Sequence, residues 1–474
     1  MSSRIGSNQL VRLLGAWAVG DGALHYQLGV ALRNLVRSGS LPGGARLPSE
    51  RTLASTLDTS RTTVALAFEA LRSDGLFMSR RGDGTYVSTA GQHGRQRGDD
   101  RLSTFVDAPG PRSDRIDLRS AALPGLELVA EEFDRMDLTM LRAQVRLHGY
   151  QPSGLVELRH AVANYYADLG LATSVEQILI TSGAQQALRL MATSLLEPGA
   201  TVLIEEPSFR GAIEVLRRVG ARLVPVPSGP CGIDVEVLAT ALRRHRVALV
   251  VLQSTVHNPT GSVLPEQGRA AVASLAAAAG VPVLDDIAPC DTQFDGPTPR
   301  PLASHGGPIF TLGSTSKAFW GGLRVGWVRA DLGTVTPLTL LKSGEDLGTS
   351  LLAQVVATHL LPRIGEARTA RANALITAKS ALLEVLASAL PDWEPQVPSG
   401  GASMWVRLPF GSATAFAQHS DRCGVAVLPG PTFSSVDGLD DHLRVAFAAP
   451  ISELLAGVER LASAWHEFAA HPRD

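Results

Sequence analysis

The stretch 310-FTLGSTSKAFWGGLRVGW-327 places Lys317 directly after a short apolar run and ahead of a glycine pair. Lys317 is one of only three lysines among 474 residues, because arginine carries almost all of the positive charge. The run PIFTLG is typical of a strand, and ligands bind at the carboxyl ends of strands in open α/β sheets. A lysine there becomes a Schiff-base nucleophile if desolvation or nearby cations lower its pKa. A surface lysine in a turn is the alternative.

Runs rich in β-branched residues alternate with helical runs from about residue 116 onward: QILIT, TVLIEE, ALVVLQ, VPVLDD and PIFTLG. Strands separated by helices predict parallel βαβ units and a helix-covered, mostly parallel sheet, so the fold class is α/β. Residues 1–88 predict a separate small domain. Residues 89–115 are polar, charge-mixed and interrupted by glycine and proline, which predicts a flexible linker. A linker of that kind lets the small domain contact a different surface or a different subunit.

Composition excludes several classes of protein. Hydrophobic residues make up 45% of the chain and charged residues 19%, which favours a large packed core. The cysteines Cys231, Cys290 and Cys423 lie far apart without metal-ligand spacing, so we expect reduced thiols, a cytoplasmic location and no metal. No signal peptide is visible, and no apolar run is long enough to span a bilayer, so we expect a soluble protein with no membrane partner.

The first 90 residues are basic, with ten arginines against six acidic residues, although the whole chain has a net charge of −2. Their pattern is helix, helix, turn, helix and then a hairpin with a glycine-rich tip, which is a winged helix-turn-helix arrangement. Ser49 is placed as a helix N-cap. We expect DNA contacts from the helix starts and the wing, namely Ser49, Arg51, Ser60, Arg61, Thr62, Thr63, Arg80, Arg81, Gly82 and Gly84. A small helical domain used for oligomerisation is the alternative.

Polar groups follow several predicted strands of the large domain. After QILI the amides of Gly183, Ala184 and Gln185 open a helix, where they either cradle a phosphate or only cap the helix. Phe209 follows another strand and either stacks on a flat ring or packs in the core. Asn258 ends a third strand as a side-chain donor.

Two further strand ends complete the set. VPVLDD ends with Asp285 and Asp286, and a buried carboxylate needs a partner such as a protonated pyridine nitrogen. Ser314, Ser316 and Arg324 surround Lys317 with phosphate donors. These strand ends together predict a pyridoxal 5'-phosphate site.

Two family resemblances agree with these patterns. The segments LPSER, SRTTV and the glycine-rich wing, within residues 24–88, resemble the DNA-binding domain of the GntR superfamily of bacterial regulators. GYQPSGLVELR, TSGAQQAL, HNPTG, LDD, SxSK and LRVAF, from about 145 to 450, resemble fold-type I pyridoxal-phosphate enzymes of the aspartate aminotransferase superfamily, with a smaller C-terminal subdomain. The combination resembles the MocR subfamily of transcription regulators. It implies a homodimer, typically head-to-tail, in which each DNA-binding domain packs on the partner's large domain.

The resemblance also implies roles for individual residues. Tyr150 would reach the phosphate of the neighbouring subunit's cofactor, and Arg444 would hold an amino-acid carboxylate with help from Arg324. Asn258 would contact the ring oxygen and Asp285 the ring nitrogen. The direct phosphate ligands would be Gly183, Ala184, Ser314, Ser316 and Arg324.

One departure bears on activity. The family usually has a tyrosine shortly after the ring-nitrogen aspartate, where this chain has Ile287 and Ala288. We therefore expect a regulator that binds DNA and senses pyridoxal phosphate or a small amino compound through an aldimine at Lys317. An aminotransferase with an accessory DNA-binding domain is the first alternative. A regulator whose large domain has lost the cofactor and serves only to dimerise is the second. The effector, the operator and the sign of regulation do not follow from the sequence.

Overall fold

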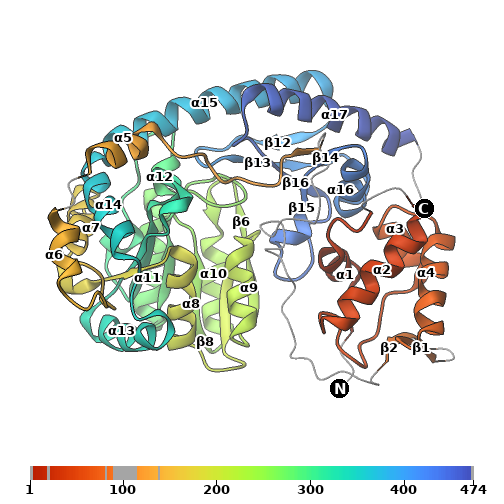
Figure 1. Cartoon of the computed structure of the whole chain (residues 1–474), viewed down its shortest axis with the longest axis horizontal. Coiled ribbons are helices and arrows are strands. Elements are labelled where there is room, and N and C mark those ends of the chain that lie inside the picture. The colour runs from red at the N-terminus through yellow and green to blue at the C-terminus, as the bar shows by residue number, and fades with distance from the viewer. Residues whose placement is uncertain (1–3, 19–21, 81–82, 89–114, 137–138, 471–474) are drawn as a thin grey trace.

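The computed structural model describes residues 4–18, 22–80, 83–88, 115–136 and 139–470. In it a small helical domain lies beside a much larger α/β domain, whose long helices α15 (Ile364–Ala389) and α17 (Ile451–Ala470) run along the top of Figure 1. The predicted linker 89–115 lies outside the described residues except for Arg115. None of the helices in the described ranges has both the length and the apolar character needed to cross a bilayer.

The small domain has the predicted winged helix-turn-helix order, preceded by one helix that the sequence pattern did not predict. Its elements are α1 (Ser7–Leu14), α2 (Leu24–Arg37), α3 (Glu50–Thr56), α4 (Arg61–Ser73), β1 (Phe77–Arg80) and β2 (Gly84–Val87). Ser49 caps α3 as predicted, because its hydroxyl accepts a hydrogen bond from the Thr52 amide at 3.1 Å. Ser60 caps α4 in the same way through the Thr63 amide at 3.0 Å.

The core of the small domain forms where the apolar faces of its helices meet. Val64, Phe68 and Leu71 of α4 are fully buried, and the Phe68 ring meets the Phe77 ring edge to face with centroids 5.2 Å apart. Leu66 of the same helix is 48% exposed. Two residues from Val64, Leu66 lies on the opposite face of the helix.

An eight-stranded sheet forms the centre of the large domain and confirms the α/β prediction. Its order is β4-β11-β10-β9-β8-β5-β6-β7, with only β11 and β7 antiparallel to their neighbours. The strands are β4 (Ile178–Thr181), β5 (Thr201–Glu206), β6 (Arg222–Gly229), β7 (Gly232–Ile233), β8 (Val247–Leu252), β9 (Val283–Asp286), β10 (Ile309–Ser314) and β11 (Gly326–Arg329). Each of the five predicted strand segments forms one of them.

Helices cover both faces of this sheet because successive strand residues point to opposite sides. Leu284 and Leu312 pack in one apolar cluster with α8, whereas Val283 and Ile309 pack in another with α11. The helices are α5 (Glu127–Arg135), α6 (Thr139–Val145), α7 (Val156–Asp168), α8 (Ala184–Leu195), α9 (Arg210–Arg218), α10 (Val235–Arg244), α11 (Glu266–Ala279), α12 (Thr315–Ala318), α13 (Leu332–Asp346) and α14 (Leu351–Leu360). Short 3₁₀ turns are η2 (Val175–Gln177), η3 (Cys290–Thr292), η4 (Leu302–His305), η5 (Gly321–Leu323) and η6 (Leu361–Arg363).

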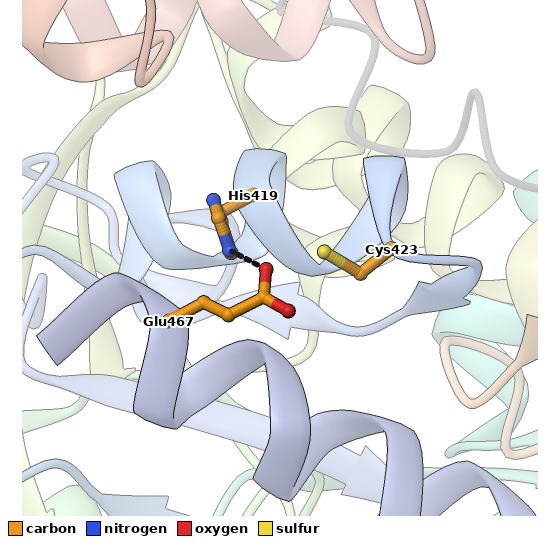
Figure 2. Close-up of side chains that lie close together, drawn as sticks. All are labelled: His419, Cys423 and Glu467. Atoms are coloured by element: carbon orange, nitrogen blue, oxygen red, sulfur yellow. Dashed lines mark ion pairs between the residues drawn. The ribbon is translucent and has the colours of Figure 1, made fainter. Parts of the chain in front are cut away.

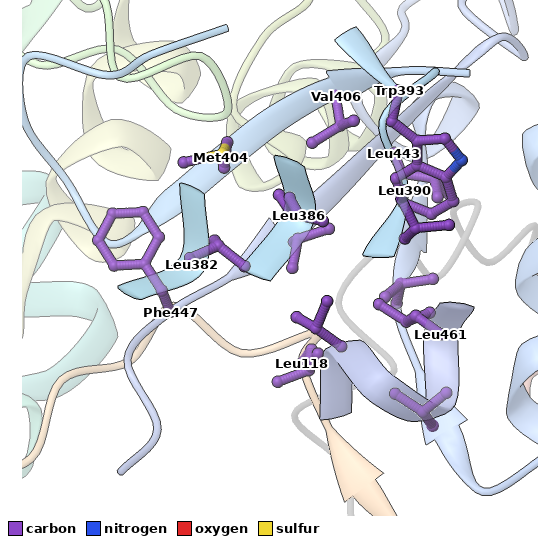
Figure 3. Close-up of a cluster of buried hydrophobic side chains, with 14 of the residues drawn as sticks. Leu118, Leu382, Leu386, Leu390, Trp393, Met404, Val406, Leu443, Phe447 and Leu461 are labelled. Carbon is purple, nitrogen blue, oxygen red and sulfur yellow. The ribbon is translucent and has the colours of Figure 1, made fainter. Parts of the chain in front are cut away.

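A smaller subdomain packs α15 and α17 against a four-stranded sheet of order β12-β13-β16-β15. Its core includes Leu382, Trp393, Phe447 and Leu461, and Figure 3 shows these side chains meeting between the helices and the sheet. Its other elements are β3 (Ile116–Asp117), β12 (Glu394–Gln396), β13 (Ser403–Arg407), α16 (Ala413–Arg422), β14 (Val425–Ala426), β15 (Leu428–Pro429), η7 (Gly430–Phe433) and β16 (His442–Ala446). β3, which follows the predicted linker, pairs in parallel with β14.

The small domain docks on α16 of its own chain. Asp58, in the turn between α3 and α4, forms an ion pair with Arg422 and accepts a hydrogen bond from His419 Nδ1 at 3.1 Å. Arg422 also donates to the carbonyls of Leu57 and Asp58. The family resemblance implied docking on a partner's large domain. In this structure the chain's own α16 supplies the complementary charges.

His419 is the titratable group of this interface. Figure 2 shows its ring beside Glu467 and Cys423, and the polar atoms of the three side chains lie within 4.8 Å of one another. The hydrogen bond to Asp58 is the main cause that raises the pKa of His419 from 6.5 to about 9. The protonated ring therefore stabilises docking, an effect that is complete below about pH 6.5 and is lost as the pH rises through 9.

We expect the two domains to separate more readily at pH 9 than at pH 6.5. The radius of gyration from small-angle scattering should increase over this interval in the wild type. His419→Gln should flatten the pH dependence, whereas Arg422→Gln should loosen docking at both pH values. An equally steep pH dependence in His419→Gln would contradict this role for His419.

Candidate functional site

A cavity of about 170 Å³ opens at the carboxyl ends of the central strands. The structure brings nine of the sequence-predicted residues to its wall: Ala184, Gln185, Phe209, Asn258, Ser314, Ser316, Lys317, Arg324 and Arg444. The other lining residues are Ala121, Ala122, Arg210, Gln253, Asp286, Ala288 and Pro289. Tyr150, Gly183 and Asp285, which were also predicted, are not among the residues that line it.

Lys317 lies in α12, the short helix that begins where β10 ends. Ser314 caps this helix by accepting from the Ser316 amide at 3.1 Å, and Lys317 Nζ donates to the Ala121 carbonyl at 3.0 Å. Burial, followed by the positive charges of Arg444 and Arg371, lowers the pKa of Lys317 to about 8, although Asp286 opposes the shift. A sizeable fraction of the amine is therefore neutral near physiological pH, which is the state that attacks a carbonyl carbon.

A group of hydrogen-bond donors, which we call the phosphate cradle because it was predicted to hold a phosphate, lies where α8 begins. Gly183 has φ +105°, and a Cβ there would lie 2.7 Å from Arg324 Nη2. The Arg324 side chain lies against this glycine and donates to the Ser182 carbonyl at 2.6 Å. Because the first amides of a helix lack partners within the helix, those of Ala184 and Gln185 suit an anion. The serine hydroxyls and Arg324 supply further donors, so the donor set fits a phosphate.

Phe209 lies at the start of α9. Its ring lies so close to Gly211 that a Cβ at that position would be 2.5 Å from the ring. The side chain also packs against the apolar cluster beneath the sheet. It therefore lines the cavity and extends the core at once, which makes a flat, immobile wall for an aromatic ligand.

The two neighbouring aspartates at the end of β9 have different surroundings. Asp285 is not among the residues that line the cavity, and it accepts hydrogen bonds from the Ser254 amide and hydroxyl at 3.0 and 2.7 Å. Asp286 lines the cavity and accepts from Gln253 Nε2 at 3.0 Å. Successive strand residues face opposite sides, so only one of the pair can reach the cavity. Burial raises the pKa of both carboxyl groups, that of Asp285 to about 6.

Asn258 and Arg444 are directly bonded. Arg444 Nη1 donates to Asn258 Oδ1 at 3.2 Å, and Arg444 Nη2 donates to the Arg119 carbonyl. Arg444 Nε is a buried donor without a hydrogen-bond partner among the described residues. Burial, and next the nearby charge of Arg210, lowers the Arg444 pKa. A buried guanidinium with an unused donor favours an anionic ligand.

Two further predictions concern Tyr150 and the position where the family usually has a tyrosine. Tyr150 is 59% exposed and does not line the cavity of its own chain. Ile287 is buried in the core, whereas Ala288 lines the cavity at the place where the family usually has a tyrosine. No tyrosine is among the described residues that line the cavity, so the second ring-oxygen donor of that family pattern, a phenol, is missing from this wall.

Several site residues escaped the sequence analysis. Arg210 follows Phe209 directly, and an arginine at the start of a helix after a strand was a usable signal. Arg371 comes from the distant helix α15 and donates to the carbonyls of Lys317, Ala318, Phe319 and Pro124, which fixes α12. No local pattern marks that contact.

The small domain brings basic side chains to a second hollow, between α3, α4 and the hairpin. Arg46, Arg51 and Arg61 line it together with Ser49 and Gly84. Thr62 at the start of α4 is exposed, and Arg80 lies over the Tyr86 ring at 4.4 Å. Of the remaining predicted contacts, Arg81 and Gly82 lie outside the described residues. A helix start flanked by arginines is the geometry of a DNA-reading helix.

Comparison with known proteins agrees with the description of both domains. Residues 25–87 match the family model of bacterial regulatory proteins, gntR family, and residues 114–461 match that of aminotransferase class I and II. The chain is 29% identical over 477 residues to YisV, an HTH-type transcriptional regulator of Bacillus subtilis, covering 93% of this chain and 96% of YisV. It is 29% identical to the probable rhizopine catabolism regulatory protein MocR of Rhizobium meliloti, covering 65% of each chain.

Among solved structures, the crystal structure of LysN, an alpha-aminoadipate aminotransferase from Thermus thermophilus, matches with a TM-score of 0.69 and 30% identity. The match covers 75% of this chain and 93% of LysN, whose structure is a complex with N-(5'-phosphopyridoxyl)-L-leucine.

We expect Gly183→Ala to weaken cofactor binding specifically. The strained φ should lower the free energy of unfolding by about 1–3 kcal/mol, and the new methyl group should displace Arg324 from the cradle. Gly199→Ala is the matched control, because Gly199 has φ +85° with nothing within 4 Å of a Cβ. Both variants should lose stability, but only Gly183→Ala should show a higher Kd for pyridoxal phosphate in an absorbance titration. Equal Kd values would argue against the cradle.

Proposed function

Because the chain belongs to the aminotransferase class I and II family and carries a gntR-family domain ahead of it, we propose that it is a MocR-type transcription regulator that senses a small amino compound through pyridoxal phosphate. This proposal rests chiefly on the position of Lys317, whose partly neutral amine lies beside the phosphate cradle. When bound, the cofactor supplies an electrophilic aldehyde carbon and an electron-withdrawing ring.

The residues at the cavity divide the work of holding the cofactor. Lys317 Nζ provides the covalent anchor, and Arg324, Ser314, Ser316 and the first amides of α8 hold the phosphate. Phe209 supports one face of the ring, and Asn258 contacts the ring oxygen. A carboxyl group of the Asp285–Asp286 pair holds the proton of the ring nitrogen, and Asp286 is the better placed because it lines the cavity.

Arg444 is the proposed ligand for the acid group of the effector. Its unused Nε donor and its burial support this role. Arg324 already lies in the phosphate cradle, so we assign the effector contact chiefly to Arg444.

Binding at Arg444 has a short structural connection to the DNA-binding domain. β16, which carries Arg444, is fastened to the start of α16 because Asp440 accepts hydrogen bonds from the Thr414 amide at 2.9 Å and the Ser412 hydroxyl at 2.7 Å. The other end of α16 holds Asp58. An effector that favours one orientation of this subdomain therefore shifts the docking of the small domain.

A second connection runs through α1. The Arg444 guanidinium lies 4.8 Å from the centre of the Phe433 ring in η7. Arg12 of α1 forms an ion pair with Asp437 at 2.7 Å and reaches the Pro431 carbonyl. Both connections therefore link Arg444, the proposed effector-binding residue, to the DNA-binding domain.

We also propose a head-to-tail homodimer in which Tyr150 completes the partner's site. Support comes from the exposure of Tyr150 together with that of Val145 and Leu147, which are 75% and 59% exposed. Such a group of exposed apolar side chains is typical of a protein contact.

An aminotransferase with an accessory DNA-binding domain is the second candidate, favoured by the full set of Lys317, Asn258 and Arg444 and by the likeness to LysN. Ala288 argues against rapid turnover because it leaves Asn258 as the remaining side-chain donor to the ring oxygen. Sustained transfer of an amino group to a 2-oxo acid over many turnovers would favour the enzyme.

We expect Lys317→Ala to abolish covalent attachment of the cofactor. Wild-type protein saturated with pyridoxal phosphate should gain mass after borohydride reduction, and Lys317→Ala should not. Lys379→Ala is the control, since Lys379 lies over the Phe294 ring and outside the cavity. A reducible mass increment that persists in Lys317→Ala would exclude Lys317 as the anchor.

We expect Arg61→Ala to weaken DNA binding by about 1–3 kcal/mol. The measurement is a gel shift at several salt concentrations with a duplex selected from a random library. Arg37→Ala is the control, because Arg37 is an exposed arginine of the same domain outside the basic hollow. Unchanged affinity and salt dependence in Arg61→Ala would remove α4 as the reading helix.

A further inference from the structure

Three side chains of the kinds that bind transition metals gather where α16 packs against α17. They are His419 and Cys423 of α16 and Glu467 of α17, and one ligand atom from each lies within 4.8 Å of the others. Figure 2 shows the ring, the sulfur and the carboxylate turned toward the same space. Among the residues that the structure describes, this is the one group of its kind. None of its members lines the proposed cofactor cavity.

The helix supplies two of the three ligands by simple spacing. Residues four apart lie one turn from each other on a helix, so His419 and Cys423 share one face of α16. The sequence analysis predicted no metal from the spacing of the three cysteines. Only Cys423 belongs to this group, and its partners are a histidine on the same helix and a carboxylate from another helix.

The docked small domain fixes the ring of His419. A carboxylate only accepts hydrogen bonds, so the bond from His419 Nδ1 to Asp58 Oδ2 at 3.1 Å requires a proton on Nδ1. The neutral ring then has its lone pair on Nε2. Nε2 is buried and makes no hydrogen bond of normal geometry to a described residue, although Cys423 lies beside it and Glu467 Oε2 is 3.8 Å away. A metal-binding histidine usually has its second nitrogen bonded to a carboxylate in this way.

The donor set and the spacing both suit Zn²⁺. Zinc binds thiolate, imidazole and carboxylate at about 2.0–2.3 Å, so neighbouring ligands of a tetrahedral site lie roughly 3.3–3.8 Å apart. The distance between His419 and Glu467 already falls in this range. The Glu467 side chain is 64% exposed, so it can turn toward the metal and leaves a path from solvent. Mg²⁺ and Ca²⁺ prefer oxygen ligands, and the thiol disfavours them.

We propose that His419, Cys423 and Glu467 form a Zn²⁺ site with a water as fourth ligand, and that Asp58 positions the histidine. The site lies outside the cofactor cavity, so the inference does not depend on the proposed function. Zinc and a proton compete for Nε2, so the pH dependence of docking described above belongs to the metal-free chain. Because Asp58 is part of the small domain, zinc binding and docking strengthen each other by the same factor.

The test is metal binding to the untagged full-length protein, kept reduced with a thiol-free reductant. Zn²⁺ is titrated by calorimetry, and Co²⁺ is added to a second sample because a thiolate–cobalt bond gives a charge-transfer band in the difference spectrum. We expect one Zn²⁺ per chain and a cobalt band that Zn²⁺ removes and Mg²⁺ does not. Cys423→Ser should lose both the band and the zinc binding. Cys231→Ser is the matched control, because Cys231 is an exposed free cysteine outside the group.

Asp58→Asn tests the positioning role. Asparagine tolerates the left-handed backbone of this turn, where Asp58 has φ +48°, but it removes the charge that holds the His419 ring. We expect the affinity for Zn²⁺ to fall about 10- to 100-fold. Asp74→Asn is the control, because Asp74 pairs with Arg33 elsewhere in the same domain.

Each result supports or overturns a defined part of the proposal. Absence of zinc binding in the wild type, or a cobalt band that persists in Cys423→Ser, overturns the site. Unchanged zinc affinity in Asp58→Asn overturns the positioning role of Asp58 alone. Glu467→Gln should weaken zinc binding while keeping the cobalt band, and equal affinity would remove Glu467 from the ligand set. This variant changes an exposed position, so it still tests the site if Cys423→Ser does not fold.

Discussion

The structure depends on a buried group of cations around Lys317 that the chain holds with few carboxylates. Lys317 Nζ, Arg444 and Arg371 donate to backbone carbonyls of Ala121, Arg119 and the residues of α12. Carbonyl dipoles satisfy hydrogen bonds without cancelling charge, so the positive potential of the cavity is retained. Burial, followed by this potential, keeps the Lys317 amine partly neutral, and the potential makes the cavity receptive to anions. In the proposed function, cofactor anchoring and effector binding both depend on residues of this one wall.

Much of the architecture could be predicted because local sequence patterns indicate its strands and helices. Each β-branched run became a strand, and the polar residues that follow these runs gather at one sheet edge, since parallel strands end together. Local patterns did not predict the features that depend on contacts between residues far apart in sequence. The pair Asp285–Asp286 gives no sign in the sequence of which carboxylate lines the cavity, because that depends on contacts with residues distant in sequence, such as the hydrogen bonds of Ser254 to Asp285. Arg371 and the contact of Asp58 with Arg422 join residues far apart in sequence, and no spacing rule connects them.

Ala288 bears on the choice between the two proposed functions, sensing and turnover. The cavity has the residues proposed as anchor, cradle and acid-binding arginine, yet it has a methyl group where a phenol would help to set the proton affinity of the bound cofactor. A site that binds an amine well but processes it slowly keeps its ligand for longer. That property suits a regulator, because a signal that is destroyed as soon as it is bound cannot shift a conformational equilibrium for long.

The pairing of β3 with β14 has a mechanical consequence. The peptide that leaves the small domain re-enters the fold within the same subdomain whose α16 receives Asp58. Asp58 and α16 are therefore tethered near each other by the same chain. After they separate, their renewed contact depends on a fixed effective concentration. Occupancy of that contact should not change on dilution. The balance between docked and released small domains is therefore set within each chain and not by the number of copies in a cell.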